Sequence, residues 1–381
     1  MIHFSAAEMA ARRTRLENEL EKRGLDGILC FAQESMYWLT GYDTFGFCFF
    51  QCLVVGGAEP VLLTRSADNL QARITSNISD IRIWVDDDRA EPAQELAALV
   101  RELGLAGKRL GIELDTHGLT AKNYIRLREA MQGVAELVDA SDLFSRLRLI
   151  KSAEELDYVK RAAELADDAL DAAKELIRPE CDEGDLLAAM QGAVFRGGGD
   201  YPGNEYIIGS GENALLVRYA AGTRKLSRRD QLTLEWAGTY RHYHAAMMRT
   251  AITGEPSPLH VRMHKAVTEA LLASEEALRP GNRMQAVFDA HANSLDAAGF
   301  NSARLNACGY SLGARFTPTW MEHEMFRKGA ATVMHPGMVM FIHIILVDGG
   351  TGMAMTTGRT SVLTETGSEN LSRHDLAMIC G

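Results

Sequence analysis

The 381-residue sequence lacks the marks of several large classes of protein. Its six cysteines are scattered and include no Cys-x-x-Cys pair, so neither a disulfide scaffold nor a zinc knuckle is expected. It has no block of like charges and no Lys/Arg-rich stretch with interleaved aromatics, which argues against a nucleic-acid partner despite the net charge of -11. The longest apolar run, residues 337–347, is too short to span a bilayer. Without an apolar signal segment at the N-terminus, we expect a cytoplasmic protein with no membrane partner.

The length predicts two domains, because a globular domain has roughly 150 residues. Residues 1–145 show helical and strand-like segments in alternation, beginning with a helix capped by Ser5 and ended by Gly24, and this pattern is typical of an α/β domain. A long amphipathic helix then begins at Ser152. Its Ser and the Glu three residues later form a predicted capping box, and the domain boundary is placed just before it.

Residues 146–381 are expected to form the second domain. Strands centred on positions 205, 215, 234, 245, 340 and 360 alternate with helical segments within 182–198, 257–280 and 283–300. Helices laid against an antiparallel sheet give the α+β class, with an N-terminal α/β domain in front.

Three landmarks stand in order along the second domain: IKSAEELDYVKRAAELA, YRHYHAAMMRT and PGMVMFIHIIL. With the N-terminal α/β domain, they resemble the creatinase / aminopeptidase P family, which has the pita-bread fold, over essentially the whole chain. Most members of that family are peptidases that hold two metal ions with two Asp, one His and two Glu. In this sequence the five positions fall on Glu235, Ala246, Tyr310, His343 and Gly358.

A single carboxylate therefore remains at the four acidic positions. Two adjacent divalent ions need several anionic ligands to offset their mutual repulsion, so the dinuclear peptidase site is not expected and no cofactor is predicted. The stretches MYWLTGYDTFGFCFFQC, LEWAGTYRHYH, ACGYSLGARFTPTW and LTETGSENL are similar to the metal-free ectoine hydrolase branch of the family. That resemblance implies a metal-independent hydrolase that cleaves a C–N bond in a small polar solute by opening a cyclic amidine.

Three residues are the catalytic candidates under this interpretation. Glu235 is the expected nucleophile, with general base as the second role, and His244 is the expected acid/base. Tyr310 could donate its hydroxyl proton to developing charge or orient the nucleophile. A solvent-facing Glu and a structural His are the ordinary alternatives, and the sequence leaves them open.

The substrate-binding candidates begin with Arg218, whose guanidinium suits a carboxylate on the substrate. His242 is expected to share a strand face with His244 and Ala246. Aromatic rings could surround an amidinium by cation–π attraction. The remaining candidates are Tyr243, His343, Trp320, Trp236 and Phe45.

The resemblance also implies a homodimer in which the N-terminal domain approaches the partner's active site, with residues 36–52 acting across the interface. Two other interpretations stay open. One is an Xaa-Pro-dipeptidase-like or creatinase-like hydrolase with a rewired, mononuclear metal site built from His242, His244, His343 and Glu235. The other is a non-catalytic binding homologue. Gly358 removes the last acidic position, so a hydroxylated ectoine, a lactam or another amidine also fits as substrate.

Overall fold

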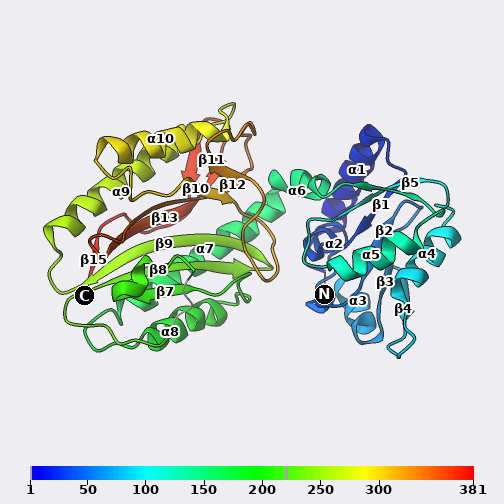
Figure 1. Cartoon of the computed structure of the whole chain (residues 1–381), viewed down its shortest axis with the longest axis horizontal. Helices are drawn as coiled ribbons and strands as arrows, with labels where there is room; N and C mark the ends of the chain where they lie inside the picture. The colour runs from blue at the N-terminus through cyan, green and yellow to red at the C-terminus, as the bar shows by residue number, and fades with distance from the viewer. Residues whose placement is uncertain (1, 219–221) are drawn as a thin grey trace. The chain divides into compact units, whose positions relative to one another are not determined.

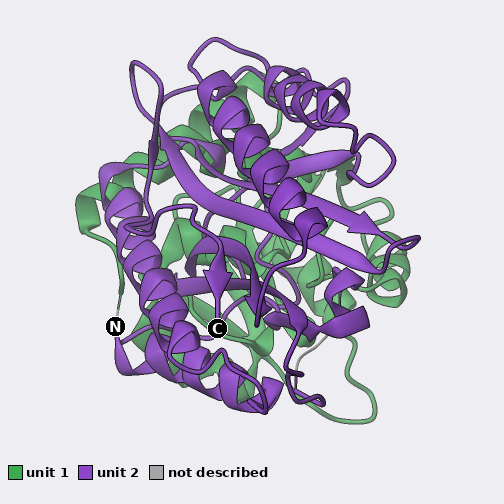
Figure 2. Ribbon diagram, turned by 90° about the vertical axis from the view of Figure 1, so that its left-hand side faces the viewer, with its two compact units in different colours: residues 1–148 green, residues 149–381 purple. Residues whose placement is uncertain are grey.

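The computed structural model describes residues 2–218 and 222–381. Contacts divide the chain into two compact units, residues 1–148 and 149–381 (Figure 2). The division lies close to the predicted boundary. The predicted class, α+β with an N-terminal α/β unit, is confirmed (Figure 1).

Unit 1 is a six-stranded sheet with helices on both faces. Its elements are α1 (Ala6–Arg23), β1 (Gly27–Cys30), α2 (Gln33–Thr40), η1 (Gly46–Cys48), β2 (Cys52–Val55), β3 (Val61–Arg65), η2 (Ser66–Asp68), α3 (Asn69–Thr75), β4 (Asp80–Trp84), α4 (Pro92–Glu102), β5 (Arg109–Ile112), α5 (Ala121–Ala130), β6 (Glu136–Asp139) and α6 (Asp142–Leu149).

The strands of unit 1 follow the order β4-β3-β2-β1-β5-β6, with β2 antiparallel to its two neighbours and the other pairs parallel. Alternate residues of β1 enter different cores: Leu29 packs with α4 and α5, while Ile28 packs with α1, α2 and α6. This alternation follows from the two-residue period of a strand.

Unit 2 is built on a second, larger sheet. Its elements are α7 (Ala153–Lys174), α8 (Glu183–Arg196), β7 (Ile207–Ser210), η3 (Gly211–Leu215), β8 (Asp230–Tyr240), β9 (Tyr243–Thr253), α9 (Pro258–Ala277), α10 (Met284–Ala297), β10 (Ala307–Ser311), β11 (Met325–Arg327), β12 (Val339–Asp348), β13 (Met353–Leu363), β14 (Ser368–Asn370) and β15 (Ile379–Cys380). Among the described residues of the chain, no helix has both the length and the apolar character to cross a membrane.

The main path of this sheet runs β11-β10-β12-β13-β9-β8-β7 (Figure 1). Helix α7 packs against β8 and β9, and α9 packs against β12 and β13. Trp236 of β8 donates its indole N–H to the carbonyl of Ala166 on α7 at 2.9 Å, and Arg359 of β13 pairs with Glu275 on α9 at 2.7 Å. We call the opposite surface, which carries Glu235, Met248, Gly358 and His343, the site face.

Local sequence signals account for the start of unit 2. Ser152 accepts a hydrogen bond from the backbone N–H of Glu155 at 3.3 Å, and the Glu155 carboxylate accepts one from the N–H of Ser152 at 2.9 Å. The predicted capping box is therefore confirmed. The strand predicted around position 215 is wrong, because Gly211–Leu215 is a 3-10 turn that follows the short strand β7.

Candidate active site

Four residues that the sequence placed far apart form one row across the unit 2 sheet. In the antiparallel register Glu235 lies opposite Met248, Met248 opposite Gly358, and Gly358 opposite His343. Directly paired residues in antiparallel strands project from the same face. The row therefore places Glu235 and His343 on the site face, away from α7, α9 and α10.

Tyr310 meets this row because the sheet curves. Strands β12, β13 and β9 lie between β10 and β8, so a flat sheet would hold Tyr310 and Glu235 about 19 Å apart. Instead the Tyr310 hydroxyl donates to Oε1 of Glu235 at 3.4 Å. Trp320 donates its indole N–H to the same hydroxyl oxygen at 2.8 Å. Curvature thus brings together two of the three predicted catalytic residues and one predicted aromatic.

The electrostatics of this pair depend on burial. Glu235 is only partly exposed, and desolvation raises its pKa to about 7, although the nearby Arg218 guanidinium and the Tyr310 hydrogen bond act in the opposite direction. Burial, followed by the charge of Glu235, holds the pKa of Tyr310 well above its usual 10. At neutral pH Glu235 therefore exists in both forms, while Tyr310 keeps its proton.

Arg218 itself is exposed, yet its charge acts on Glu235, Tyr310 and His343. This placement suits the predicted contact with an anionic group of a substrate.

His343 is buried among aromatic rings on the site face. Its ring centroid lies 5.6 Å from that of Tyr310 and 5.4 Å from that of Phe341. Its buried Nδ1 has no hydrogen-bond partner among the described residues. Burial is the main reason that the pKa of His343 falls to about 3, so the ring is neutral at physiological pH.

His244 does not reach Glu235. His244 pairs with Thr239 of β8. Thr239 is four residues from Glu235, which places the two backbone positions about 13 Å apart along the strand. Nε2 of His244 accepts the backbone N–H of Gly203 at 2.8 Å, and the ring is fully buried. Burial lowers its pKa to about 3. The geometry therefore gives His244 an anchoring contact instead of the acid/base position predicted for it.

His242 was expected in the same strand as His244, and that expectation is wrong. It lies in the two-residue turn before β9 with a left-handed φ of 63°. Its ring stacks on Phe316 with a centroid distance of 4.1 Å.

Trp236 and Tyr243 were predicted to line the substrate pocket, and the structure contradicts this. Both project to the face that packs on α7: the indole of Trp236 contacts Ala166, and the Tyr243 hydroxyl donates to Glu155 at 2.7 Å. In a strand each side chain must project to one face of the sheet or the other, and the packing of α7 determines which face that is for Trp236 and Tyr243.

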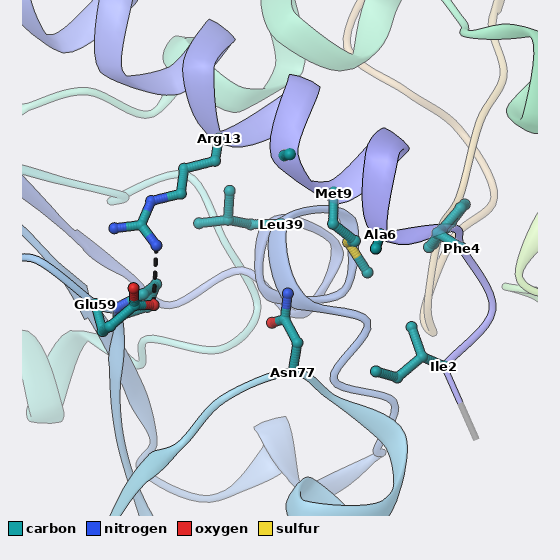
Figure 3. Close-up of a pocket in the computed structure, with 10 residues that line it drawn as sticks. Ile2, Phe4, Ala6, Met9, Arg13, Leu39, Glu59 and Asn77 are labelled. Carbon is teal, nitrogen blue, oxygen red and sulfur yellow. Dashed lines mark hydrogen bonds and ion pairs between the residues drawn. The ribbon is translucent and has the colours of Figure 1, made fainter.

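Phe45 belongs to unit 1, where it precedes η1 and is 81% exposed. The same unit contains a cavity of about 340 Å³ that includes none of the predicted site residues (Figure 3). Apolar side chains such as Met9 and Leu39 form much of its lining, and Arg13 and Glu59 form an ion pair of 2.9 Å beside it. The one carboxylate in its lining, that of Glu59, is paired with Arg13, so it is not placed as a nucleophile for the predicted reaction.

The residues on the site face do not fit a metal centre. Within residues 2–218 and 222–381, no group of three or more His, Cys, Asp or Glu side chains is arranged to hold an ion. A Cβ at Gly358 would lie 2.7 Å from the carbonyl of Ile342 and 3.0 Å from the ring of Phe341, so no side chain fits there without movement. The mononuclear His cluster fails as well, because His244 and His242 are engaged away from Glu235.

Sequence reasoning missed three residues that shape this site. Asn204 accepts the backbone N–H of Trp320 at 3.1 Å, Gly203 contacts His244, and Phe341 covers Gly358. The Pro-Gly-Asn sequence at 202–204 signals a turn, but no local signal links that turn to Trp320.

Comparisons with known proteins identify the family of each unit. Residues 157–365 match the metallopeptidase family M24, and residues 12–150 match the creatinase/prolidase N-terminal domain. The ectoine hydrolase of Halomonas elongata is 29% identical over 390 residues, covering 97% of this chain and 96% of that protein. An uncharacterized hydrolase/peptidase of Sinorhizobium fredii is also 29% identical, over 98% of this chain and 97% of its own length.

Among solved structures, the Xaa-Pro dipeptidase from Bacillus anthracis superposes with a TM-score of 0.86 at 23% identity and covers 98% of this chain and 100% of its own. At that identity the similarity concerns the fold alone.

Proposed function

Because the chain belongs to the M24 metallopeptidase family and yet retains one carboxylate at the four acidic positions expected from the family resemblance, we propose that it is a metal-independent hydrolase of a small cyclic amidine of the ectoine type. The observation that carries the proposal is the partly exposed Glu235, which accepts the Tyr310 hydroxyl on a site face without a metal-binding cluster among its described residues. The 29% identity to an ectoine hydrolase over nearly the whole chain supports the same substrate class.

The proposed reaction uses Glu235 as the nucleophile. Its carboxylate oxygen attacks the amidinium carbon and forms a C–O bond. The ring C–N bond then breaks as the departing nitrogen takes the proton that the nitrogen remaining on that carbon gives up. Water adds to the acyl-type intermediate, releases the N-acylated product and restores the carboxylate. One water molecule is consumed overall. The pKa of about 7 leaves a large ionised fraction of Glu235 for attack at neutral pH.

Three side chains around Glu235 have proposed roles in the reaction. The Tyr310 hydroxyl, 3.4 Å from Oε1, is a donor that orients the Glu235 carboxylate before attack and stabilises the negative charge that returns to it when the intermediate is hydrolysed. The neutral ring of His343 supplies an aromatic wall beside Tyr310. Arg218 is proposed to bind the carboxylate of the substrate, since its guanidinium is exposed and close enough to act on the site.

The homodimer remains part of this proposal. Its support within the chain is the exposed aromatic segment around η1, where Phe45 is 81% and Phe49 is 47% exposed. Exposed rings of this size on a loop are suited to cover a small-molecule site in a second copy of the chain. Loss of turnover in Phe45→Ala, with binding weakened and unit 1 still folded, would support that role.

The test measures turnover of ectoine and of hydroxyectoine after exhaustive dialysis against a chelator, with the N-acetylated diaminobutyrate identified by mass spectrometry. We expect activity to persist in chelator, to vanish in Glu235→Gln and to survive in Glu365→Gln, an exposed acid used as the matched control. Intact-mass analysis of rapidly quenched protein should show a substrate adduct only when Glu235 is present. Turnover that requires added zinc, manganese or iron would contradict the proposal.

A further inference from the structure

Trp320 determines which way the Tyr310 proton points. Indole nitrogen is only a donor, so its 2.8 Å contact makes the Tyr310 oxygen an acceptor on that side. Tyr310 has one proton left to give, and Glu235 lies 3.4 Å away. Both aromatic residues are almost fully buried, at 1% and 4% exposed, so bulk water does not compete for these contacts.

Trp320 itself belongs to no strand. It lies in the segment between β10 and β11, and its position depends on contacts with the loop before β7. Asn204 accepts its backbone N–H at 3.1 Å. The Gly203 backbone lies directly against this segment, because a Cβ at Gly203 would be 2.7 Å from the Thr319 carbonyl group and 2.8 Å from the Trp320 nitrogen.

His244 holds the other side of that loop. Its Nε2 accepts the Gly203 N–H at 2.8 Å, which requires this nitrogen to be unprotonated, and its Nδ1 faces the Gly313 carbonyl oxygen at 3.4 Å. A proton on Nε2 would oppose the Gly203 N–H. The depressed pKa of the buried ring agrees with this neutral form.

We propose that Trp320 and His244 are positioning residues: the neutral His244 ring fixes Gly203 and Asn204, these fix Trp320, and the Trp320 indole directs the Tyr310 hydroxyl toward Glu235. The hydrogen-bond relay is a property of the folded chain. Only its effect on rate rests on the function proposed above.

The first test replaces the donor and keeps an aromatic ring. Trp320→Phe should raise the pKa of Glu235, because Tyr310 becomes a weaker and less directed donor, and should lower kcat about tenfold with KM changed less than twofold. Trp84→Phe is the matched control, since that indole also donates one buried hydrogen bond, to the Phe50 carbonyl at 3.0 Å in unit 1. It should leave kcat and the Glu235 pKa unchanged.

The second test separates positioning from proton transfer at His244. The amide oxygen of His244→Gln can accept the Gly203 N–H in place of Nε2, so this variant should keep kcat within about threefold, whereas His244→Phe should behave like Trp320→Phe. If His244→Gln is as inactive as His244→Phe, the ring acts by chemistry and the proposal is overturned.

One measurement does not depend on the substrate. Carbon-13 NMR of carboxyl-labelled Glu, with the signal assigned by its loss in Glu235→Gln, reports the pKa directly. An upward shift in Trp320→Phe supports the relay even if ectoine is not turned over, which would count against the proposed function alone. An unchanged Glu235 titration in folded Trp320→Phe overturns the relay. Circular dichroism confirms folding, and Trp320→Phe decides the matter if His244→Phe does not fold.

Discussion

Phe341 occupies the space above Gly358. The two residues lie on neighbouring strands, and a Cβ at position 358 would be 3.0 Å from a ring carbon of Phe341. The ring also packs edge-on against Tyr310, with centroids 5.5 Å apart. Position 358 therefore lacks an acidic side chain, and the Phe341 ring occupies part of the space that such a side chain would need. Restoring an acid there requires the ring to move.

Gly358→Glu should consequently destabilise the fold without creating a metal site. Overpacking of this kind typically lowers the free energy of unfolding by about 1–3 kcal/mol. Each kcal/mol lowers the melting temperature of a unit of this size by about 2–4 °C. Calorimetry with zinc and manganese should show no binding above the parent protein. Adding Phe341→Ala should not recover the lost stability, because the Ile342 carbonyl remains 2.7 Å from the new Cβ and deletion of a fully buried ring itself costs about 3–5 kcal/mol. Stoichiometric metal in either variant would contradict this account of the site.

Glu235→Gln should stabilise the protein while abolishing turnover. The folded pKa of about 7 lies above the usual 4.5, so the folded state loses stability as pH rises through that window because the buried carboxylate must ionise. The variant should match the parent at pH 4.5 and exceed it by about 3 kcal/mol at pH 8. Urea denaturation at the two pH values measures the difference. In the parent, kcat/KM should rise between pH 6 and 8 as the nucleophile ionises.

Arg218→Gln should affect binding more than chemistry. Loss of a charge-assisted contact to the substrate carboxylate is expected to raise KM about tenfold or more, with a smaller change in kcat. Arg228→Gln, another exposed arginine on the same connecting segment, provides the control. Methyl-ester analogues of the substrate should be insensitive to Arg218→Gln. Equal loss for acid and ester would show that Arg218 does not contact the carboxylate.

His291→Leu should raise stability, and the gain should grow in acid. Both ring nitrogens of this buried residue lack partners among the described residues, so an apolar replacement removes an unsatisfied group worth about 1 kcal/mol. Burial lowers the pKa of His291 to about 4. Its neutral form contributes stability that is complete above pH 6.5 and is lost as pH falls toward 4. Thermal melts should therefore show a larger difference in melting temperature between variant and parent at pH 5 than at pH 7.

Much of the fold could be predicted because its signals are local. Ser152 and Glu155 are three residues apart, and the capping box that they form is read from spacing alone. Helical periodicity likewise predicted α8, α9 and α10. The prediction of a strand around 215 failed because the apolar run there, residues 214–217, is too short to distinguish a strand from a 3-10 turn.

The site was harder to predict because its contacts depend on register and curvature. Family resemblance placed Glu235, Tyr310 and His343 at equivalent positions, and the sheet brings them onto one face. The orientation of Trp236 could not be derived from strand alternation, since only the packing of α7 distinguishes the two faces. Asn204 acts through a contact with a segment more than a hundred residues away, which no local pattern reveals.

The electrostatic effect of Arg218 on Glu235 has a further consequence for which solutes the site face can select. With Glu235 ionised, the site face carries an electric dipole, positive at the guanidinium and negative at the carboxylate. A zwitterionic solute can align antiparallel to that dipole and neutralise both ends, whereas a singly charged one leaves one end uncompensated in a partly desolvated environment. Selection by charge separation would disfavour simple cations and anions at the site without a steric gate.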